Sequence, residues 1–172
     1  MFVEKNVIEI VALEEIKIVG LSLGKLGWPK HGNGGIYPKM WGLFDTEYRA
    51  KVKNMKDPFV GYWFWYNEPN DKDGYDYFIG GAVADFEDVD GALVTFIVPA
   101  GRYIRHAFNA EDFGKLVDGA LAGSREIVEK WAGENDVKIV NMPQALSQDI
   151  QVYPEKELAA EYPSMYTLTP IE

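Results

Sequence analysis

Cysteine is absent from the 172 residues of the sequence, and histidine occurs only twice. The absence of cysteine excludes disulfide bonds, thiolate metal sites and thiol nucleophiles. The two histidines, His31 and His106, are far apart and share no metal-like spacing with acidic residues. We therefore expect no metal site and no cofactor, and we expect both histidines at the surface. The sequence also lacks a nucleophile elbow and a recognisable catalytic triad, so we assign no catalytic residue.

Long hydrophobic runs are missing as well. No segment approaches the roughly 18 apolar residues that indicate a membrane-spanning helix. The N-terminal residues include early acids and no apolar run before a small-residue cleavage site, so they do not resemble a signal peptide. We expect a cytoplasmic protein with no membrane partner.

Basic residues are in the minority, with 17 lysines and arginines against 27 acids, which gives a formal net charge of -10. Such a surface repels phosphate backbones, so direct nucleic-acid binding is disfavoured. The same charge favours cations, although many soluble proteins carry it for solubility alone.

Aromatic residues are abundant, at 14% of the chain, within a hydrophobic content of 47%. A chain of this length buries roughly two-thirds of its unfolded surface, so the composition is ample for a core. The stretch FVGYWFWYNEP, residues 59–69, has five consecutive aromatics from Tyr62 to Tyr66. Neighbouring side chains of a strand point to opposite faces. The strand would therefore present large rings on both faces of its sheet, and only one face is explained as core.

The order of predicted elements repeats once along the chain. Strand, helix, strand and strand are indicated by residues 7–24 (with a bend near Glu14 and Glu15), 36–55, 59–66 and 75–85, and then again by 92–110, 110–133, 149–156 and 164–172. Residues 25–35 and 67–74 are predicted loops. The paired glycines Gly80 and Gly81 indicate a bulge or a close backbone contact in their strand.

This repetition predicts a single α+β domain, residues 1–172, made of two pseudo-symmetric halves near 1–88 and 89–172. Each half would contribute strands to one antiparallel sheet and a helix to one of its faces. We expect a ligand groove along the seam between the halves, on the face that the helices leave open.

The sequence resembles the GyrI-like, or AraC-type, effector-binding domain family. The resemblance rests on segments in the family's order: VALEEIKIVGLS (11–22), MWGLF (40–44), GYDYFIGGAV (74–83), VPAGRYIRHAF (98–108), VEKWAG (128–133), DIQVYP (149–154) and YTLTPI (166–171). It implies the duplicated fold described above and an aromatic pocket between the halves. That pocket would bind a hydrophobic, often cationic, small molecule, as in the effector-binding domains of bacterial transcription regulators.

Two departures from the family qualify this expectation. The family commonly places a ligand-neutralising acid in a Phe-Glu-x-Tyr segment, and the matching position here is Gln151, two residues before Tyr153. An amide can hydrogen-bond a ligand but supplies no charge, which leaves Asp76 or Asp149 as substitutes. The sequence also begins at the first predicted strand, without a preceding helix-turn-helix. We therefore expect it to act through a separate regulator protein or by sequestering its ligand.

Alternation along the aromatic strand places Phe64 and Tyr66 in the groove and Trp63 and Trp65 under the helix. The predicted ligand-binding residues are Trp41, Phe64, Tyr66, Tyr103, Gln151, Tyr153 and Tyr166.

Two other functions remain open beside the binding module. One is hydrolysis of reactive cyclopropane-type genotoxins, which the resemblance offers as an enzymatic alternative. The exchange of the expected acid for Gln151 argues against it, because acid–base catalysis needs a carboxylate within reach of the reacting atom. The other is inhibition of a DNA-binding protein by an acidic surface, for which no local feature speaks. We favour the binding module over the enzyme.

Overall fold

The computed structural model describes residues 1–29, 36–66, 76–140 and 149–172. Its strands are β1 (Asn6–Leu13), β2 (Ile16–Ser22), β3 (Val60–Tyr66), β4 (Asp76–Val83), β5 (Val94–Val98), β6 (Gly101–Asn109), β7 (Ile150–Pro154) and β8 (Ser164–Ile171). Its helical segments are α1 (Leu23–Leu26), α2 (Ile36–Leu43), η1 (Phe44–Tyr48), η2 (Arg49–Lys51), η3 (Lys115–Leu121), α3 (Ala122–Glu134) and α4 (Glu155–Leu158). The predicted turn over 67–74 and the second part of the predicted loop over 25–35, with His31, lie outside the described residues.

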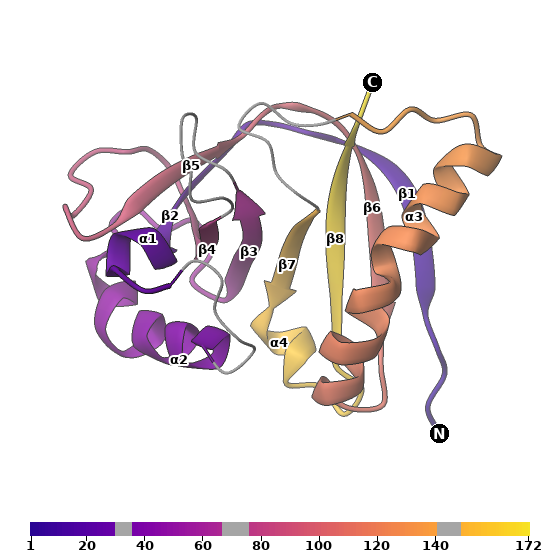
Figure 1. The fold of residues 1–172 in the computed structure, drawn as a ribbon, viewed down its shortest axis with the longest axis horizontal. Helices are drawn as coiled ribbons and strands as arrows, with labels where there is room; N and C mark the ends of the chain where they lie inside the picture. The colour runs from indigo at the N-terminus through magenta and orange to yellow at the C-terminus, as the bar shows by residue number, and fades with distance from the viewer. Residues whose placement is uncertain (30–35, 67–75, 141–148) are drawn as a thin grey trace.

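The eight strands form one antiparallel sheet in the order β1-β6-β8-β7-β3-β4-β2-β5 (Figure 1). The predicted α+β class with a single antiparallel sheet is therefore confirmed. The β3–β7 ladder, which pairs Val60 with Pro154 through Trp63 with Gln151, joins the strands of the two predicted halves, and we refer to it as the seam.

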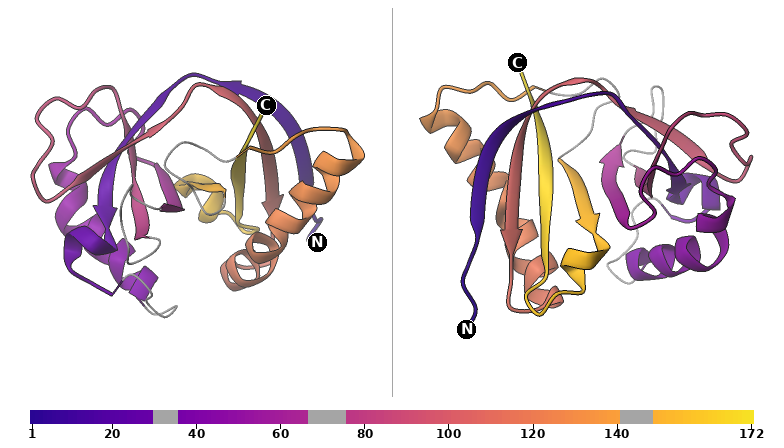
Figure 2. Two further views of the ribbon diagram at one scale, coloured as in Figure 1. Left: turned by 45° about the horizontal axis from the view of Figure 1, so that its top comes forward. Right: turned by 180° about the vertical axis from the view of Figure 1, so that it is seen from behind.

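A long two-stranded ribbon connects the outer parts of the sheet. β1 pairs with β6, and β2 pairs with β5, in a register that continues through the bend, since Leu13 faces Gly101 and Ile16 faces Val98. Figures 1 and 2 show this ribbon as an arch over the molecule. The first strand of the chain thus pairs with the second set of strands. The division into halves at residues 88 and 89 stays a prediction.

The helices lie on one face of the sheet, and the opposite face is closed by a core that contains strand residues alone. Ten buried side chains form this core, which we call the strand core: Ile18, Phe64, Tyr66, Phe78, Phe96, Val98, Tyr103, Ile150, Val152 and Leu168. They come from both sides of the seam. The other three clusters each contain helix residues, among them Met40 and Phe44, Leu116, and Val128. The predicted groove on the face away from the helices is therefore wrong, because the curved sheet packs that face against itself.

The helices keep the predicted positions but not the predicted regularity. The first begins at Ile36 as an α-helix, widens to a π-helix over η1, tightens to a 3-10 turn over η2 and ends at Lys51. The second combines the π-helical η3 with α3. Two single-turn helices were not predicted. One is α1, which Ser22 caps by accepting a hydrogen bond from the backbone N–H of Lys25 at 3.0 Å. The other is α4, which follows Pro154.

Candidate functional site

A cavity of about 730 Å³ lies over the seam on the helix-bearing face. One wall comes from α2, η1 and η2. The other wall comes from η3 and from Phe113 and Gly114, which precede it, and α4 contributes Glu155 and Leu158. Figure 2 shows these two helical walls on opposite sides of the seam strands. Eight aromatic or apolar side chains line the cavity: Tyr37, Pro38, Trp41, Trp63, Phe113, Val117, Tyr153 and Leu158. The size and lining are those of a small-molecule site.

The floor of the cavity follows from the register at the seam. Gly61 faces Tyr153, and Trp63 faces Gln151, so alternation places all four on the face that carries the helices. Gly61 leaves space that the Trp41 ring fills, because a Cβ placed at Gly61 would lie 2.7 Å from Cη2 of Trp41. The glycine therefore lets the indole of a helix residue lie directly on the strand backbone.

Three rings contact one another around this floor. Trp63 and Tyr153 are tilted by 30° with centroids 4.6 Å apart. Trp41 meets Trp63 edge-on at 5.8 Å and Tyr153 edge-on at 6.3 Å. Each such pair contributes about 0.5–1.5 kcal/mol beyond its buried area. The rings are thus held by one another before any ligand arrives, and a flat or cationic molecule could stack on them.

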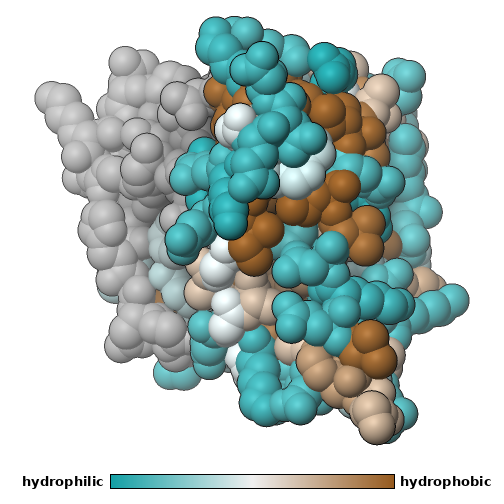
Figure 3. Space-filling model, turned by 90° about the vertical axis from the view of Figure 1, so that its right-hand side faces the viewer, coloured by the Kyte–Doolittle hydropathy of each residue, from teal (hydrophilic) through white to brown (hydrophobic). Residues whose placement is uncertain are grey.

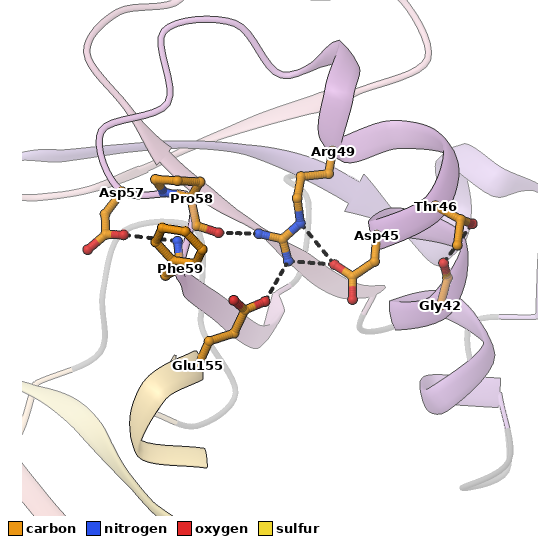
Figure 4. Close-up of polar contacts among 8 residues, drawn as sticks. All are labelled: Gly42, Asp45, Thr46, Arg49, Asp57, Pro58, Phe59 and Glu155. Carbon is orange, nitrogen blue, oxygen red and sulfur yellow. Dashed lines mark hydrogen bonds and ion pairs between the residues drawn. The ribbon is translucent and has the colours of Figure 1, made fainter. Parts of the chain in front are cut away.

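Charged groups lie at the rim of the cavity. Its lining includes the carboxylates of Asp45, Asp118 and Glu155 and one guanidinium, that of Arg49. Arg49 donates from Nε to Asp45 Oδ1 at 3.0 Å and lies 3.7 Å from Glu155 Oε1. It also donates to the carbonyl of Pro58. Figure 4 shows this bridge between the helical segment η2 and the start of α4. The rim has an excess of acid over base and therefore favours a cation.

Tyr153 supplies a hydroxyl group at the cavity. Burial raises its pKa above the ordinary value, so the hydroxyl stays protonated at neutral pH and can act as a hydrogen-bond donor. It donates to Gln151 Oε1 at 3.2 Å. Gln151 itself borders a second, smaller cavity of about 250 Å³, which also includes Asp149, Arg125 and Thr167.

Neither of the proposed substitute acids lies in the large cavity. Asp76 is buried in β4, where its carboxylate accepts hydrogen bonds from the backbone N–H groups of Gly24 and Tyr77. Asp149 accepts from Arg125 Nη1 at 2.8 Å and from the hydroxyl of Thr169 at 2.7 Å. Both carboxylates thus have structural partners, and the acids near the large cavity are the rim residues instead.

The predicted site residues fall into three groups. Trp41 and Tyr153 line the large cavity, and Gln151 lies beside it, at the second cavity. Phe64, Tyr66 and Tyr103 lie in the strand core. Tyr166 packs at the border of that core, with the guanidinium of Arg105 over its ring at 4.3 Å.

Four residues of the site were not predicted from the sequence: Gly61, Trp63, Arg49 and Phe113. Gly61 and Trp63 could have been predicted, because a ligand site at Tyr153 implies, for strands paired in this register, that its neighbours on the same face belong to the site. Arg49 and Phe113 depend on how the helices approach the sheet, and no local signal marks them.

A buried polar chain runs beneath α3, near the second cavity. His106 is 1% exposed, so the expectation of a surface histidine is wrong. The partners of its ring are Ser124, whose Oγ lies 2.7 Å from Nδ1, and Asn6, whose Oδ1 contacts Nε2. Ser124 also contacts Thr167 at 3.1 Å. The grouping resembles a catalytic triad in composition, but Ser124 is 1% exposed and out of reach of a substrate. Its partners suit a neutral ring that donates from Nε2.

The free energy of unfolding should fall as the pH is lowered from about 7.5 to 5, in part because of His106. Burial lowers the pKa of His106 below its ordinary 6.5. In this interval the unfolded chain therefore binds more protons than the folded chain, and stability rises with pH. Urea unfolding at several pH values should give a smaller pH dependence for His106→Gln than for the wild type. Identical pH dependence in both would contradict the prediction, since the carboxylates contribute equally to each.

Two features are absent from the described residues, a metal-binding cluster and a membrane-spanning helix. In the described part of the chain, no group of three or more histidine, aspartate or glutamate side chains is placed to hold a metal ion. Within the same residues, no helix combines the length and hydrophobicity needed to cross a membrane.

Comparison with solved structures identifies relatives of this fold. SAV2435 bound to tetraphenylphosphonium has 12% sequence identity and a TM-score of 0.61, over 96% of this chain and 93% of that one. The C-terminal domain of EcmrR has 13% identity and a TM-score of 0.61, over 99% of both chains. In a complex of EcmrR with DNA, this chain covers only 57% of the EcmrR chain. A hydrolase from Listeria innocua has 12% identity and a TM-score of 0.52, over 96% and 91%.

At these identities the structures establish the fold alone. A comparison with curated protein sequences returns no match. The GyrI-like effector-binding fold expected from the sequence is confirmed. The sequence over residues 9–167 matches the family described as Cass2, integron-associated effector binding protein. The match covers most of the chain, which therefore belongs to the Cass2 family of integron-associated effector-binding proteins.

Proposed function

We propose that the protein binds a hydrophobic small molecule, cationic or neutral, in the large cavity over the seam and performs no chemistry on it. The observation that carries the proposal is the ring cluster of Trp41, Trp63 and Tyr153 at the floor of a cavity of about 730 Å³. Two further findings support the proposal: the chain belongs to an effector-binding family, and a structural relative was solved with tetraphenylphosphonium.

A cationic ligand would find its charge partners at the rim and not at the family's usual position. Gln151 is neutral, whereas Asp45, Asp118 and Glu155 lie around the cavity. An aromatic face attracts a cation by about 0.5–2 kcal/mol, and the rim acids add to this attraction. A lipophilic cation could therefore place its rings against Trp63 and its charge toward the rim.

The biological role that fits this site is effector sensing for a separate regulator protein, or sequestration of the ligand, in the cytoplasm. EcmrR, whose C-terminal domain shares the fold, occurs in a complex with DNA. The formal net charge of -10 opposes direct contact of this chain with nucleic acid, so we propose regulation through a partner.

The test is calorimetric titration with tetraphenylphosphonium of the wild type and of Gly61→Ala. The new methyl group would push the Trp41 ring from the floor into the cavity, and we expect the Kd to rise about tenfold, or about 1.4 kcal/mol. Gly91→Ala is the matched control, because a Cβ there meets nothing within 4 Å, and it should bind as the wild type does.

Equal affinities of the wild type and Gly61→Ala would exclude this cavity as the site. If the wild type binds neither tetraphenylphosphonium nor any compound in a panel of lipophilic cations and neutral aromatics, the proposal fails altogether.

Hydrolysis of a reactive cyclopropane-type genotoxin is the second candidate. It is favoured by the carboxylates at the rim and by the Listeria innocua hydrolase of similar fold. Against it, Arg49 contacts one carboxylate oxygen of Asp45 and one of Glu155, which leaves these oxygens less available to activate a water molecule. Disappearance of such an electrophile, measured with and without protein, decides between the two. Turnover that is lost in Asp118→Asn or Glu155→Gln would establish the enzyme.

A further inference from the structure

Strand β1 forms one edge of the sheet, and exposed apolar side chains gather on its segment of the chain. Seven large hydrophobic residues of the described chain are exposed, and four of them lie within the first ten positions: Met1, Val3, Val7 and Ile10. Figure 1 places β1 and α3 at the right-hand side of the molecule, and Figure 3, which views that side, shows groups of hydrophobic side chains among hydrophilic ones. The edge is thus apolar as well as unpaired within the described residues.

The edge has little of the usual protection against pairing. Proteins blunt exposed strands with proline, a bulge or charged side chains, especially lysine. β1 is eight residues long, has no proline, bulge or lysine, and pairs with β6 without a break in register. Its one charged residue is Glu9, and Lys5 precedes it in the sequence.

The backbone groups that face outward can be identified. In β6, Ala110 continues the ladder to the strand on the other side, since its N–H donates to the carbonyl of Pro163. Alternation then directs the backbone N–H and C=O groups of the odd-numbered residues of β6 toward β1. In agreement, the backbone N–H of Lys5 points toward β6, where it donates to the side-chain Oδ1 of Asn109 at 2.7 Å. The odd residues of β1 therefore bond inward, and Asn6, Ile8 and Ile10 present their N–H and C=O groups outward.

We propose that the segment Val3–Val11, which contains the first six residues of β1 and the three residues before it, pairs antiparallel with the same segment of a second copy of this chain, about a two-fold axis at Val7. A two-fold axis perpendicular to the sheet keeps each side chain on its own face, so opposed residues must both be odd or both be even. Centring on Val7 opposes the two Val7 side chains, Val3 with Val11, and Lys5 with Glu9 of the second copy. All three are non-hydrogen-bonded pairs, in which side chains approach most closely.

The alternative registers are less favourable. An axis at Glu9 would oppose two carboxylates, and an axis at Ile8 would set the exposed Val7 against Glu9 of the second copy. Like charges directly opposite each other destabilise a ladder. Glu9 already lies 3.0 Å from Arg105, so Lys5 of the second copy would add a second cation to an existing pair. Exposed ion pairs contribute little affinity, and here the charge match selects the register while the valines supply the contact.

This surface is separate from the ligand site. None of the residues that line the large cavity belongs to β1, so the dimer and the proposed ligand binding can fail independently. The pairing joins the two sheets edge to edge and leaves both cavities open.

The absence of cysteine from the chain makes cross-linking a sharp test. In a non-hydrogen-bonded pair the Cα atoms are about 4.5 Å apart, which lies within the range for a disulfide. Val7→Cys should therefore give a covalent dimer on mild oxidation at micromolar protein concentration. Ile97→Cys is the matched control, because Ile97 is 39% exposed on β5, the opposite edge. A Val7→Cys chain that stays monomeric, or cross-linking of both variants at the same rate, would overturn the proposal.

Charge reversal tests the register without a covalent bond. By sedimentation equilibrium, Lys5→Glu and Glu9→Lys should each weaken the dimer at least about threefold, and the double variant should restore most of the loss. Two results would refute this pairing: a wild type that is monomeric at millimolar concentration, or single variants that dimerise as well as the wild type.

Discussion

Replacing Phe64 with alanine should lower the free energy of unfolding by about 3–5 kcal/mol. The side chain is 0% exposed. Its ring stacks on Phe78 at 4.8 Å with an interplanar angle of 13° and lies 4.5 Å from Phe96. The rings belong to different strands that pack tightly within the strand core, so the hole left by alanine cannot close by local movement.

The neighbouring substitution Trp63→Ala should have the opposite profile. Trp63 faces the large cavity, and its loss widens a hollow that already exists. We expect a stability loss of only about 1–2 kcal/mol. The affinity for tetraphenylphosphonium should fall at least about tenfold, because the ring that stacks on Tyr153 is gone. Phe64→Ala, measured where it remains folded, should bind nearly as the wild type does.

Urea unfolding and calorimetric titration of the two variants check this contrast. If Phe64→Ala lost affinity and kept its stability, Phe64 would line the ligand site, as predicted from the sequence, and the ligand would lie on the face of the strand core.

The division of the aromatic strand into two faces could be predicted from the sequence, because it needs only the period of a strand. Trp63 and Trp65 lie on the helix side, as predicted, and pack with residues of the first helix. The face that contains the hollow could not be predicted in the same way. It depends on the arch of β1, β2, β5 and β6, which closes one face of the sheet. It depends equally on the separation of the two helical walls, which leaves the seam uncovered on the other.

Only part of the candidate site could be predicted from the sequence. Trp41 and Tyr153 were proposed from positions that the family resemblance supplied, and both line the large cavity. Gly61 has no side chain and carries no chemical signal, yet it determines where Trp41 lies. Arg49 becomes part of the rim only because η2 approaches α4 in space, although more than a hundred residues separate it from Glu155. Contacts of this kind arise from packing and have no counterpart in local sequence pattern.

The second large effect on stability is expected at the glycine pair Gly20 and Gly80. These residues face each other between β2 and β4. A Cβ at Gly20 would lie 1.9 Å from the carbonyl oxygen of Ile79 and 2.6 Å from Cα of Gly80. Both obstacles are backbone atoms of a buried strand, so a side chain cannot move aside to make room. The close backbone contact that the glycines of β4 indicated is confirmed at Gly80.

Gly20→Ala should therefore destabilise the fold by about 3 kcal/mol or more, because β2 and β4 must separate where both are buried. Gly42→Ala is the matched control: a Cβ there meets nothing within 4 Å, and alanine in a helix is favoured over glycine by about 0.5–1 kcal/mol. Thermal unfolding should thus give a lower Tm for the first variant and an unchanged or higher Tm for the second. A Gly20→Ala chain as stable as the wild type would mean that β2 and β4 do not approach as closely as the structure has them. The strand core and the ring-lined cavity both depend on that approach, because β2 and β4 hold β3 in place from one side while β7 holds it from the other.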